Sequence, residues 1–254
     1  RKEQIFFRWY GKSYRKVLNT FTHLFVQDEA SVQLLRTIGI TNTTVVGDTR
    51  FDRVLEICHQ AKELPLVEKF KGNHTAFVAG SSWGPDEDIF IPYLNAHPEV
   101  KLIIAPHVID ESHLKEIIGK LNRTVVRYTQ ATEEKVKEAD CLLIDCFGLL
   151  SSIYRYGEIA YIGGGFGVGI HNVLEAAVYG MPVIFGPNNK RFREAQGLLQ
   201  CKGGFEIQGA EDFKKIMDNF LNNYEALDKA GKKAGNYVRD NAGALEKIMH
   251  TVTL

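Results

Sequence analysis

A glycine-rich segment between two apolar runs is the feature that most limits how this chain can fold. Residues 161–187 read Y-I-G-G-G-F-G-V-G-I-H-N-V-L-E-A-A-V-Y-G-M-P-V-I-F-G-P. This pattern predicts a strand, a loop, a helix and a second strand in close succession. A glycine loop lets a ligand approach the backbone amides, and the start of a helix adds partial positive charge. The segment therefore predicts a binding site for a phosphate group.

Three polar side chains at the end of this loop could complete such a site. The predicted helix opens near Asn172, and His171 and Glu175 are four residues apart, which predicts that they share one helix face. The carboxylate of Glu175 suits the hydroxyl pair of a ribose. The alternative is a tight turn that only packs helix against sheet. A zinc site at His171 and Glu175 is disfavoured because no third ligand has suitable spacing.

Short apolar runs alternate with amphipathic helical patterns along most of the chain. The runs predicted to be strands are at 76–79, 101–105, 124–128, 141–144, 160–162, 182–185 and 204–207. Helical periodicity is clear over 86–97 and 111–121, whose apolar residues are expected to belong to the core. The alternation predicts an α/β fold with a Rossmann-like, doubly wound parallel sheet.

Ligands of doubly wound sheets lie beyond the carboxyl ends of the strands. We therefore expect four segments to converge on one crevice: 81–83, 106–107, 146–149 and 163–171. Ser81 and Ser82 would offer hydroxyls there, or alternatively would cap the helix that begins near Pro85. His107 would face the ligand, or alternatively would only bond to backbone groups.

The first fifty residues have a different character. Residues 1–16 mix basic and aromatic side chains, which is typical of a segment at a membrane interface but also of a solvated helix packed on its own domain. A strand is predicted at 21–26 and a helix at 28–39. Because this pair cannot bury its own apolar face, we expect 1–48 to be the end of an N-terminal domain whose remainder is absent. Residues 49–254 would form a second domain, with a last helix at about 240–254 that crosses back to the first.

The charge balance argues against nucleic acid as a partner, and the hydropathy argues against a membrane-spanning helix. The chain has 31 basic and 31 acidic residues, so no global field attracts nucleic acid. No apolar stretch approaches the roughly 20 residues of a membrane-spanning helix. Any contact with a membrane must therefore be a surface contact.

Six motifs occur in the order and approximate spacing of a known enzyme family. They are V-V-G-D-T-R-F-D at 45–52, A-G-S-S-W-G-P-D-E at 79–87, A-P-H at 105–107, D-C-F-G at 145–148, G-G-G-F-G-V-G-I-H-N-V-L-E-A-A at 163–177 and F-G-P-N-N-K-R-F-R-E at 185–194. With these motifs the chain resembles the 3-deoxy-D-manno-octulosonic acid (Kdo) transferases of lipopolysaccharide synthesis, which are GT-B glycosyltransferases. The resemblance covers nearly the whole chain and implies the C-terminal, donor-binding half of such an enzyme.

The resemblance also implies a set of site residues. The donor CMP-Kdo would be held by Ser81, Ser82, Pro106, His107, Phe147, Gly148, Gly164, Gly165, Gly169, His171, Asn172 and Glu175. In this assignment the glycine loop holds the phosphate, Glu175 the ribose, and Phe147 with Gly148 the cytosine. Three basic residues either meet the carboxylate of the sugar or form a solvated charge run: Lys190, Arg191 and Arg193.

The activity that the resemblance implies is transfer of Kdo from CMP-Kdo to a lipid A precursor, lipid IVA, with inversion at the anomeric carbon. It implies action at the cytoplasmic face of the inner membrane of a Gram-negative bacterium, with membrane contact by the N-terminal region and residues 1–16. No metal or other cofactor is expected. The general base would lie in the absent N-terminal domain, so this chain alone would be inactive.

The chain departs from the family pattern at three places. An arginine is missing beside His107, Leu149 stands where a glutamate is common, and S-S-W at 81–83 replaces an A-S-T-H type motif. The alternatives are a GT-B transferase or epimerase that uses a UDP-sugar, or a nucleotide-binding domain without catalysis. Comparing the affinities for CMP and UDP distinguishes a UDP-sugar enzyme from a CMP-Kdo transferase.

Overall fold

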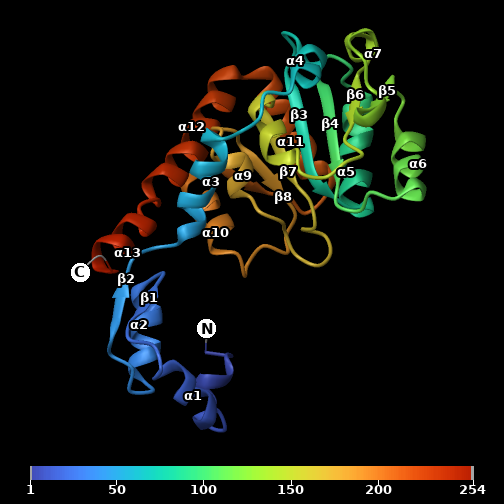
Figure 1. Ribbon diagram of the computed structural model, residues 1–254. Coiled ribbons are helices and arrows are strands. Elements are labelled where there is room, and N and C mark those ends of the chain that lie inside the picture. The colour runs from blue at the N-terminus through green and yellow to red at the C-terminus, as the bar shows by residue number, and fades with distance from the viewer. Residues whose placement is uncertain (1, 253–254) are drawn as a thin grey trace. The chain divides into compact units, whose positions relative to one another are not determined.

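A parallel sheet of seven strands organises most of the chain in the computed structural model (Figure 1). The strand order is β5-β6-β4-β3-β7-β8-β9, and every pair is parallel. The strands are β3 (Ala76–Ser82), β4 (Lys101–Pro106), β5 (Val125–Arg127), β6 (Cys141–Leu143), β7 (Ile159–Ile162), β8 (Val183–Phe185) and β9 (Gly204–Glu206). Each lies within or overlaps one of the seven predicted runs. The predicted parallel α/β sheet is confirmed.

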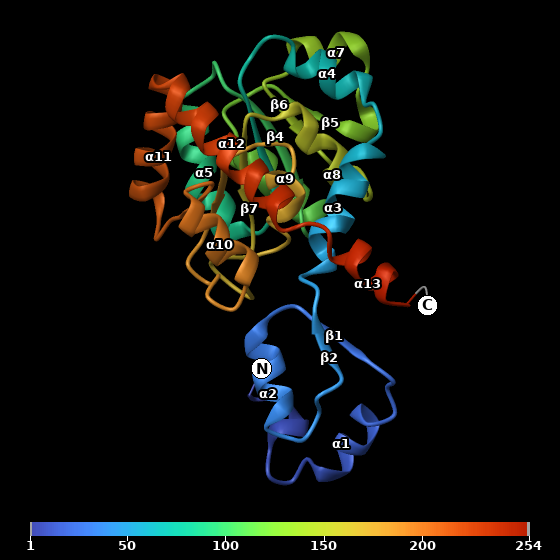
Figure 2. The same cartoon turned by 90° about the vertical axis from the view of Figure 1, so that its left-hand side faces the viewer.

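The central strands are almost fully buried, as expected for a parallel sheet covered on both faces. Helices lie on both faces (Figure 2). They are α3 (Thr49–His59), α4 (Pro65–Lys71), α5 (Gly84–Asn95), α6 (Glu111–Lys120), α7 (Glu133–Glu138), α8 (Leu150–Ile153), α9 (Leu174–Ala177), α10 (Arg193–Cys201), α11 (Ala210–Asn222) and α12 (Tyr224–Asp240). The core on the face of α5, α6 and α11 is rich in aromatic rings, among them Phe77, Phe90, Tyr161 and Phe213.

The winding direction of the sheet reverses between β3 and β7. These two strands are neighbours, but the chain leaves β3 towards β4 on one side and leaves β7 towards β8 on the other. The carboxyl ends of such a pair form the usual ligand crevice of an open α/β sheet. The end of β3 is irregular, because its pairing with β4 shifts between Gly80 and Ser82, and Ser81 has a φ of 53°. A left-handed backbone is uncommon for serine and stores strain.

The structure describes residues 2–252 and divides into two units. One unit is Val54–Arg239, which holds the seven-stranded sheet, and the other is Arg1–Arg53 with Asp240–Leu254. Two predicted segments extend beyond the described residues. Arg1, the first residue of 1–16, and residues 253–254, the last of 240–254, lie outside them. The assignment of 1–48 and 49–254 to two domains of a longer protein stays a prediction.

The smaller unit contains a strand–helix–strand motif. Strands β1 (Leu24–Val26) and β2 (Thr43–Val45) are parallel and are joined through α2 (Glu29–Arg36), whose first turn is capped by Asp28. The last helix predicted at about 240–254 is α13 (Ala244–Val252), and it follows α12, which ends at Asp240. Gly243 separates them with a φ of 100°. The carboxylate of Asp52, in the predicted V-V-G-D-T-R-F-D motif, accepts hydrogen bonds from the amides of Gly243 and Ala244 and so caps α13.

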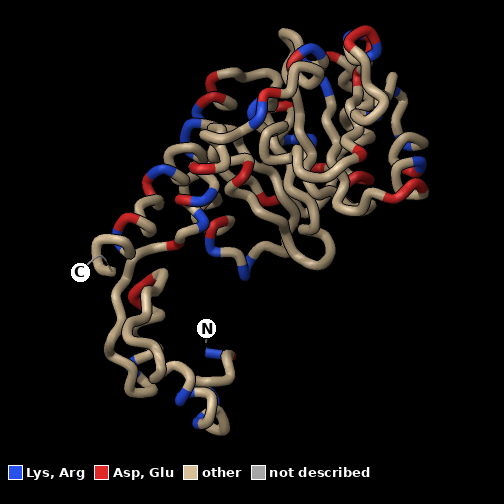
Figure 3. The backbone as a smooth tube through the Cα atoms, in the orientation of Figure 1, with Lys and Arg blue, Asp and Glu red and all other residues tan. Residues whose placement is uncertain are grey.

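The basic and aromatic residues of the N-terminal segment lie around a 3₁₀ turn, Ile5–Phe7, and α1 (Lys12–Leu18). Arg15 holds the two together by donating hydrogen bonds to the carbonyls of Phe6 and Arg8. Trp9 is 85% exposed, and Lys and Arg mark this part of the chain (Figure 3). Within residues 2–252, no helix has both the length and the apolar character needed to cross a bilayer.

Candidate functional site

A cavity of about 210 Å³ opens at the carboxyl ends of β3, β4 and β6. Its lining combines residues from the three predicted strand ends with apolar neighbours: Ser81, Ala105, Pro106, His107, Ile109, Ile144, Cys146, Phe147, Gly148 and Leu150. The predicted convergence of these strand ends is therefore confirmed. Phe147 is 80% exposed, so its ring is accessible to a ligand. Burial, and secondarily the charge of Asp145, raise the pKa of the Cys146 thiol, so this cysteine is protonated at neutral pH.

Stacked rings connect this cavity to the glycine loop. The ring of His107 stacks on Trp83 at a centroid distance of 4.6 Å and on His171 at 4.4 Å, each with an interplanar angle of 27°. The indole Nε1 of Trp83 donates a hydrogen bond of 3.2 Å to Nε2 of His171. The fourth predicted segment, 163–171, thus meets the others through His171. The amide of His107 does donate to the carbonyl of Ser82, but its ring stacks on Trp83 and His171. His107 therefore does more than bond to backbone groups.

The glycine loop is folded tightly onto the end of β3. A Cβ atom on Gly163 would lie 2.2 Å from the carbonyl oxygen of Ser81, and Gly164 has a φ of 91°. The amides of Gly167 and Gly169 both donate to the carbonyl of Gly164, and that of His171 donates to Gly163. These bonds match the tight-turn alternative for this part of the loop. A role of Gly164, Gly165 and Gly169 in binding phosphate stays a prediction.

The buried carboxylate of Asp86 accepts a hydrogen bond from the amide of Gly164. Asp86 is 1% exposed, and it accepts hydrogen bonds from Gly164 N at 2.9 Å, Tyr161 Oη at 2.8 Å and Trp83 N at 3.0 Å. Burial raises the pKa of Asp86, although its three donors favour the ionised form. The sequence reasoning did not single out Asp86. The available signal was an acidic residue in the first helical turn after Pro85, which is typical of a helix start.

The helix after the loop is shorter than predicted. It begins at Leu174, so His171 lies outside it, and the prediction that His171 and Glu175 share one helix face is wrong. The side chain of Asn172 explains the difference, because its Oδ1 accepts from Leu174 N at 3.2 Å and its Nδ2 donates to Glu175 Oε1 at 2.9 Å. A helix of four residues contributes little dipole.

One exposed backbone amide remains available at this turn. The amides of Asn172 and Val173 donate to no group within residues 2–252, but Val173 is fully buried and only Asn172 is exposed. Glu175 is half-buried beside them, and this burial raises its pKa, opposed by the hydrogen bond from Asn172. The turn therefore offers one backbone donor next to a carboxylate.

The two serines at the end of β3 differ in role. Ser81 lines the cavity, whereas Ser82 is buried and its Oγ donates to Glu87 Oε1 at 2.9 Å. Neither serine caps α5, because the cap position is Trp83, and that alternative is wrong. The other carboxylate oxygen of Glu87 lies 3.0 Å from Nε2 of His113. A direct contact of Ser82 with a ligand stays a prediction.

The three basic residues near the start of α10 are exposed and do not line the cavity: Lys190, Arg191 and Arg193. Their contact with a sugar carboxylate stays a prediction. Within residues 2–252, no group of three or more His, Cys, Asp or Glu side chains is arranged to hold a metal ion. The expectation of metal-free chemistry likewise stays a prediction.

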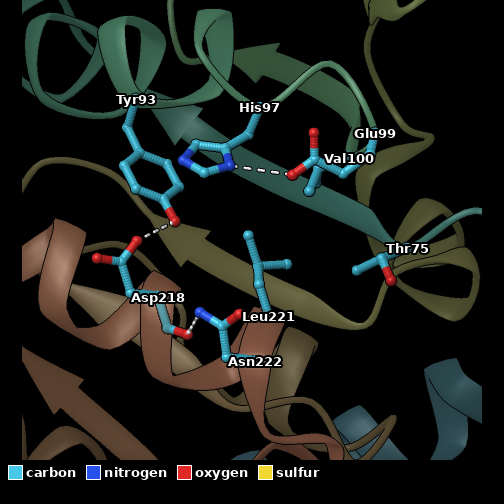
Figure 4. Close-up of a pocket in the computed structure, with 8 residues that line it drawn as sticks. All are labelled: Thr75, Tyr93, His97, Glu99, Val100, Asp218, Leu221 and Asn222. Atoms are coloured by element: carbon cyan, nitrogen blue, oxygen red, sulfur yellow. Dashed lines mark hydrogen bonds and ion pairs between the residues drawn. The ribbon is translucent and has the colours of Figure 1, made fainter.

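A second cavity, of about 240 Å³, lies at the opposite ends of the strands (Figure 4). Tyr93 Oη donates to Asp218 Oδ1 at 2.8 Å, and His97 Nδ1 lies 3.0 Å from Glu99 Oε1. Thr75 precedes β3, so this cavity is at the amino ends of the strands. Ligands of doubly wound sheets bind at the carboxyl ends of the strands. The cavity beside His107 is therefore the candidate site.

No protein-family model matches the chain. Curated proteins named 3-deoxy-D-manno-octulosonic acid transferase do match. One from Rickettsia bellii (strain RML369-C) is 26% identical over 248 residues, which cover 94% of this chain and 59% of the relative. One from Aquifex aeolicus (strain VF5) is 29% identical over 218 residues, which cover 83% of this chain and 57% of the relative. The chain thus spans somewhat over half the length of these relatives.

Solved structures share the fold. The C-terminal CMP-Kdo binding domain of WaaA from Acinetobacter baumannii has a TM-score of 0.60 at 20% identity, covering 74% of this chain and 97% of that domain. A putative UDP-N-acetylglucosamine 2-epimerase from Listeria monocytogenes has a TM-score of 0.62 at 16% identity, covering 100% of this chain and 66% of that one. These likenesses confirm the Rossmann-like half of a GT-B architecture. By sequence, the chain is a relative of the 3-deoxy-D-manno-octulosonic acid transferases over nearly its whole length.

Proposed function

We propose that this chain is the donor-binding part of a glycosyltransferase that moves Kdo from CMP-Kdo to a lipid A precursor. The observation that carries the proposal is the sequence similarity to Kdo transferases over 94% of the chain. The solved domain with the same fold that is described as CMP-Kdo binding supports the identity of the donor. The cavity at the carboxyl ends of β3, β4 and β6 is where we expect such a donor to bind, next to the switch between β3 and β7.

The base of the donor is assigned to the open side of this cavity. Phe147 exposes a ring there, and Gly148 next to it has no side chain to cover that ring. An aromatic face accepts a flat pyrimidine by offset stacking. Pro106 and His107 form the neighbouring wall. In this assignment cytosine lies against Phe147.

The phosphate and the ribose are assigned to the turn before α9. The free and exposed amide of Asn172 supplies one donor for a phosphate oxygen, and His171 supplies a second from its side chain. Glu175 accepts hydrogen bonds from the ribose hydroxyls. We assign Ser81 to the phosphate or the sugar carboxylate, and Lys190, Arg191 and Arg193 are the candidates for neutralising that carboxylate.

Transfer also needs a base that deprotonates the acceptor hydroxyl. We assign this base and the acceptor site to the part of the relatives that this chain does not cover, so the chain alone binds the donor without transferring it. The product is inverted at the anomeric carbon, and no metal is needed because hydrogen-bond donors and basic side chains stabilise the departing CMP. Residues 2–16 contact the cytoplasmic face of the inner membrane through exposed aromatic and basic side chains.

A transfer assay with the full-length protein tests the proposal. With CMP-Kdo and a tetraacylated lipid A precursor, we expect Kdo on the lipid and free CMP. Phe147→Ala is expected to raise KM for CMP-Kdo, whereas Tyr224→Ala, which removes an equally exposed ring at the start of α12, is expected to leave KM unchanged. Activity with a UDP-sugar and none with CMP-Kdo would favour the transferase or epimerase alternative.

A further inference from the structure

Three rings from three strand ends meet beside the candidate site. Trp83 follows β3, His107 follows β4, and His171 closes the loop after β7. His107 covers the other two rings by stacking on both, as described above. Trp83 and His171 are half-buried and hydrogen-bonded to each other. The arrangement therefore holds the imidazole of His171 in a defined orientation.

The hydrogen bond between Trp83 and His171 has only one possible direction. An indole Nε1 carries a hydrogen and no available lone pair, so it can donate but cannot accept. It lies 3.2 Å from Nε2 of His171, which must then be the acceptor. The proton of the neutral imidazole is consequently on Nδ1. A doubly protonated ring would bring two N–H groups face to face.

The surroundings favour the same neutral state. Burial lowers the pKa of His171, the neighbouring His107 adds to this effect, and the carboxylate of Asp86 in α5 opposes it. The net direction is downward, so the ring is uncharged at neutral pH. Within residues 2–252, no group accepts a hydrogen bond from Nδ1 of His171. Its one N–H is therefore unused.

We propose that Trp83 is a positioning residue that holds His171 as the neutral Nδ1-protonated tautomer, so that this side chain presents one N–H donor to an anionic oxygen of the ligand. The nature of the ligand, the phosphate of a CMP-sugar, rests on the proposed function. The tautomer itself rests only on the contact between the two rings. Acidification removes the acceptor at Nε2 and breaks the contact with Trp83.

The tautomer can be read directly from the ¹⁵N resonances of His171 in the 254-residue chain. At neutral pH we expect a protonated Nδ1 and an unprotonated Nε2. Trp83→Phe keeps an aromatic ring but removes the donor, and it is expected to let both tautomers populate and to raise the pKa of His171. His107→Phe keeps the Trp83 donor and is expected to retain the Nδ1-protonated tautomer. A proton on Nε2 in the wild-type protein would overturn the proposal, whatever the variants do.

Binding of CMP tests the consequence for the ligand. By calorimetry near pH 8, Trp83→Phe is expected to weaken CMP binding several-fold, because part of the His171 population no longer donates from Nδ1. An unchanged affinity in a variant with mixed tautomers would refute the donor role. If the wild-type chain shows the expected tautomer but binds no CMP, the proposed function fails while the positioning by Trp83 stands.

Discussion

The carboxylate of Asp86 accepts a hydrogen bond of 2.9 Å from the amide of Gly164 and so fastens the glycine loop to the first turn of α5. The two residues are 78 positions apart in the sequence. The same carboxylate also binds the hydroxyl of Tyr161 and the amide of Trp83. One buried group therefore fixes the loop, the end of β7 and the cap of α5 relative to one another.

Removing this carboxylate should be costly. Asp86→Ala leaves three donors without a partner, and we expect the free energy of unfolding to fall by about 3 kcal/mol. Asp86→Asn keeps an acceptor oxygen and should cost about 1 kcal/mol. Urea unfolding at neutral pH measures both. Asp88→Asn, which removes an exposed ion pair with Lys120, is the matched control and should cost less than about 1 kcal/mol. Equal losses for Asp86→Ala and Asp88→Asn would contradict this role.

Alanine at two glycines of the same loop should have opposite outcomes. At Gly163 the added methyl would lie 2.2 Å from the carbonyl oxygen of Ser81, so the backbone must shift. We expect Gly163→Ala to lose about 3 kcal/mol of stability and to weaken CMP binding. At Gly167 the nearest atom is 4.0 Å away, and alanine there should be tolerated. Thermal unfolding and calorimetry compare the two, and a tolerated Gly163→Ala would refute the close packing.

The strained backbone of Ser81 predicts a conflict between stability and binding. Ser81→Gly removes the penalty of a φ of 53° and should raise stability by about 1 kcal/mol. It also removes the hydroxyl of a residue that lines the cavity, so KM for CMP-Kdo should rise in the full-length protein. Ser81→Ala removes the hydroxyl but keeps the strain, and should raise KM without added stability. An unchanged KM in both variants would exclude Ser81 from the donor site.

The contact between His113 and Glu87 predicts a pH-dependent stability. Burial opposes the charge of His113, but the carbonyl of Val108 and the carboxylate of Glu87 outweigh it and hold its pKa above 6.5. A raised histidine pKa contributes stability that is fully present below pH 6.5 and is lost as pH rises through the folded value.

Urea unfolding between about pH 6 and about pH 9 measures this loss. His113→Gln should flatten the decline of stability with pH. Lys115→Gln, at a well-exposed position of the same helix, should leave the decline in place. A decline that is equally steep in His113→Gln would assign it to another group.

The seven strands and their convergence could be predicted because buried parallel strands leave continuous apolar runs in the sequence, as in K-L-I-I-A at 101–105. The cavity followed from the general rule that ligands lie beyond the carboxyl ends of such strands. The sequence could not predict that Ser81 lines the cavity while Ser82 is buried. The register shift between Gly80 and Ser82 decides which serine lines the cavity, and side-chain alternation does not reveal such a shift.

The contacts around the glycine loop could not be predicted from the sequence either. The pattern of residues 172–177 fits a longer helix, and only the bonds made by the Asn172 side chain show why the helix starts at Leu174. Asp86 looks like an ordinary helix-start residue until the fold places Gly164 against it. Both cases depend on partners whose proximity comes from tertiary structure.

Calorimetric titration of the 254-residue chain with CMP and with UDP tests the central claim most directly. The account predicts that CMP binds more tightly than UDP, and that Gly163→Ala weakens CMP binding while Gly167→Ala retains it. Tighter binding of UDP, or binding of CMP that is equally strong in both variants, would contradict the assignment of this site to a CMP-sugar donor.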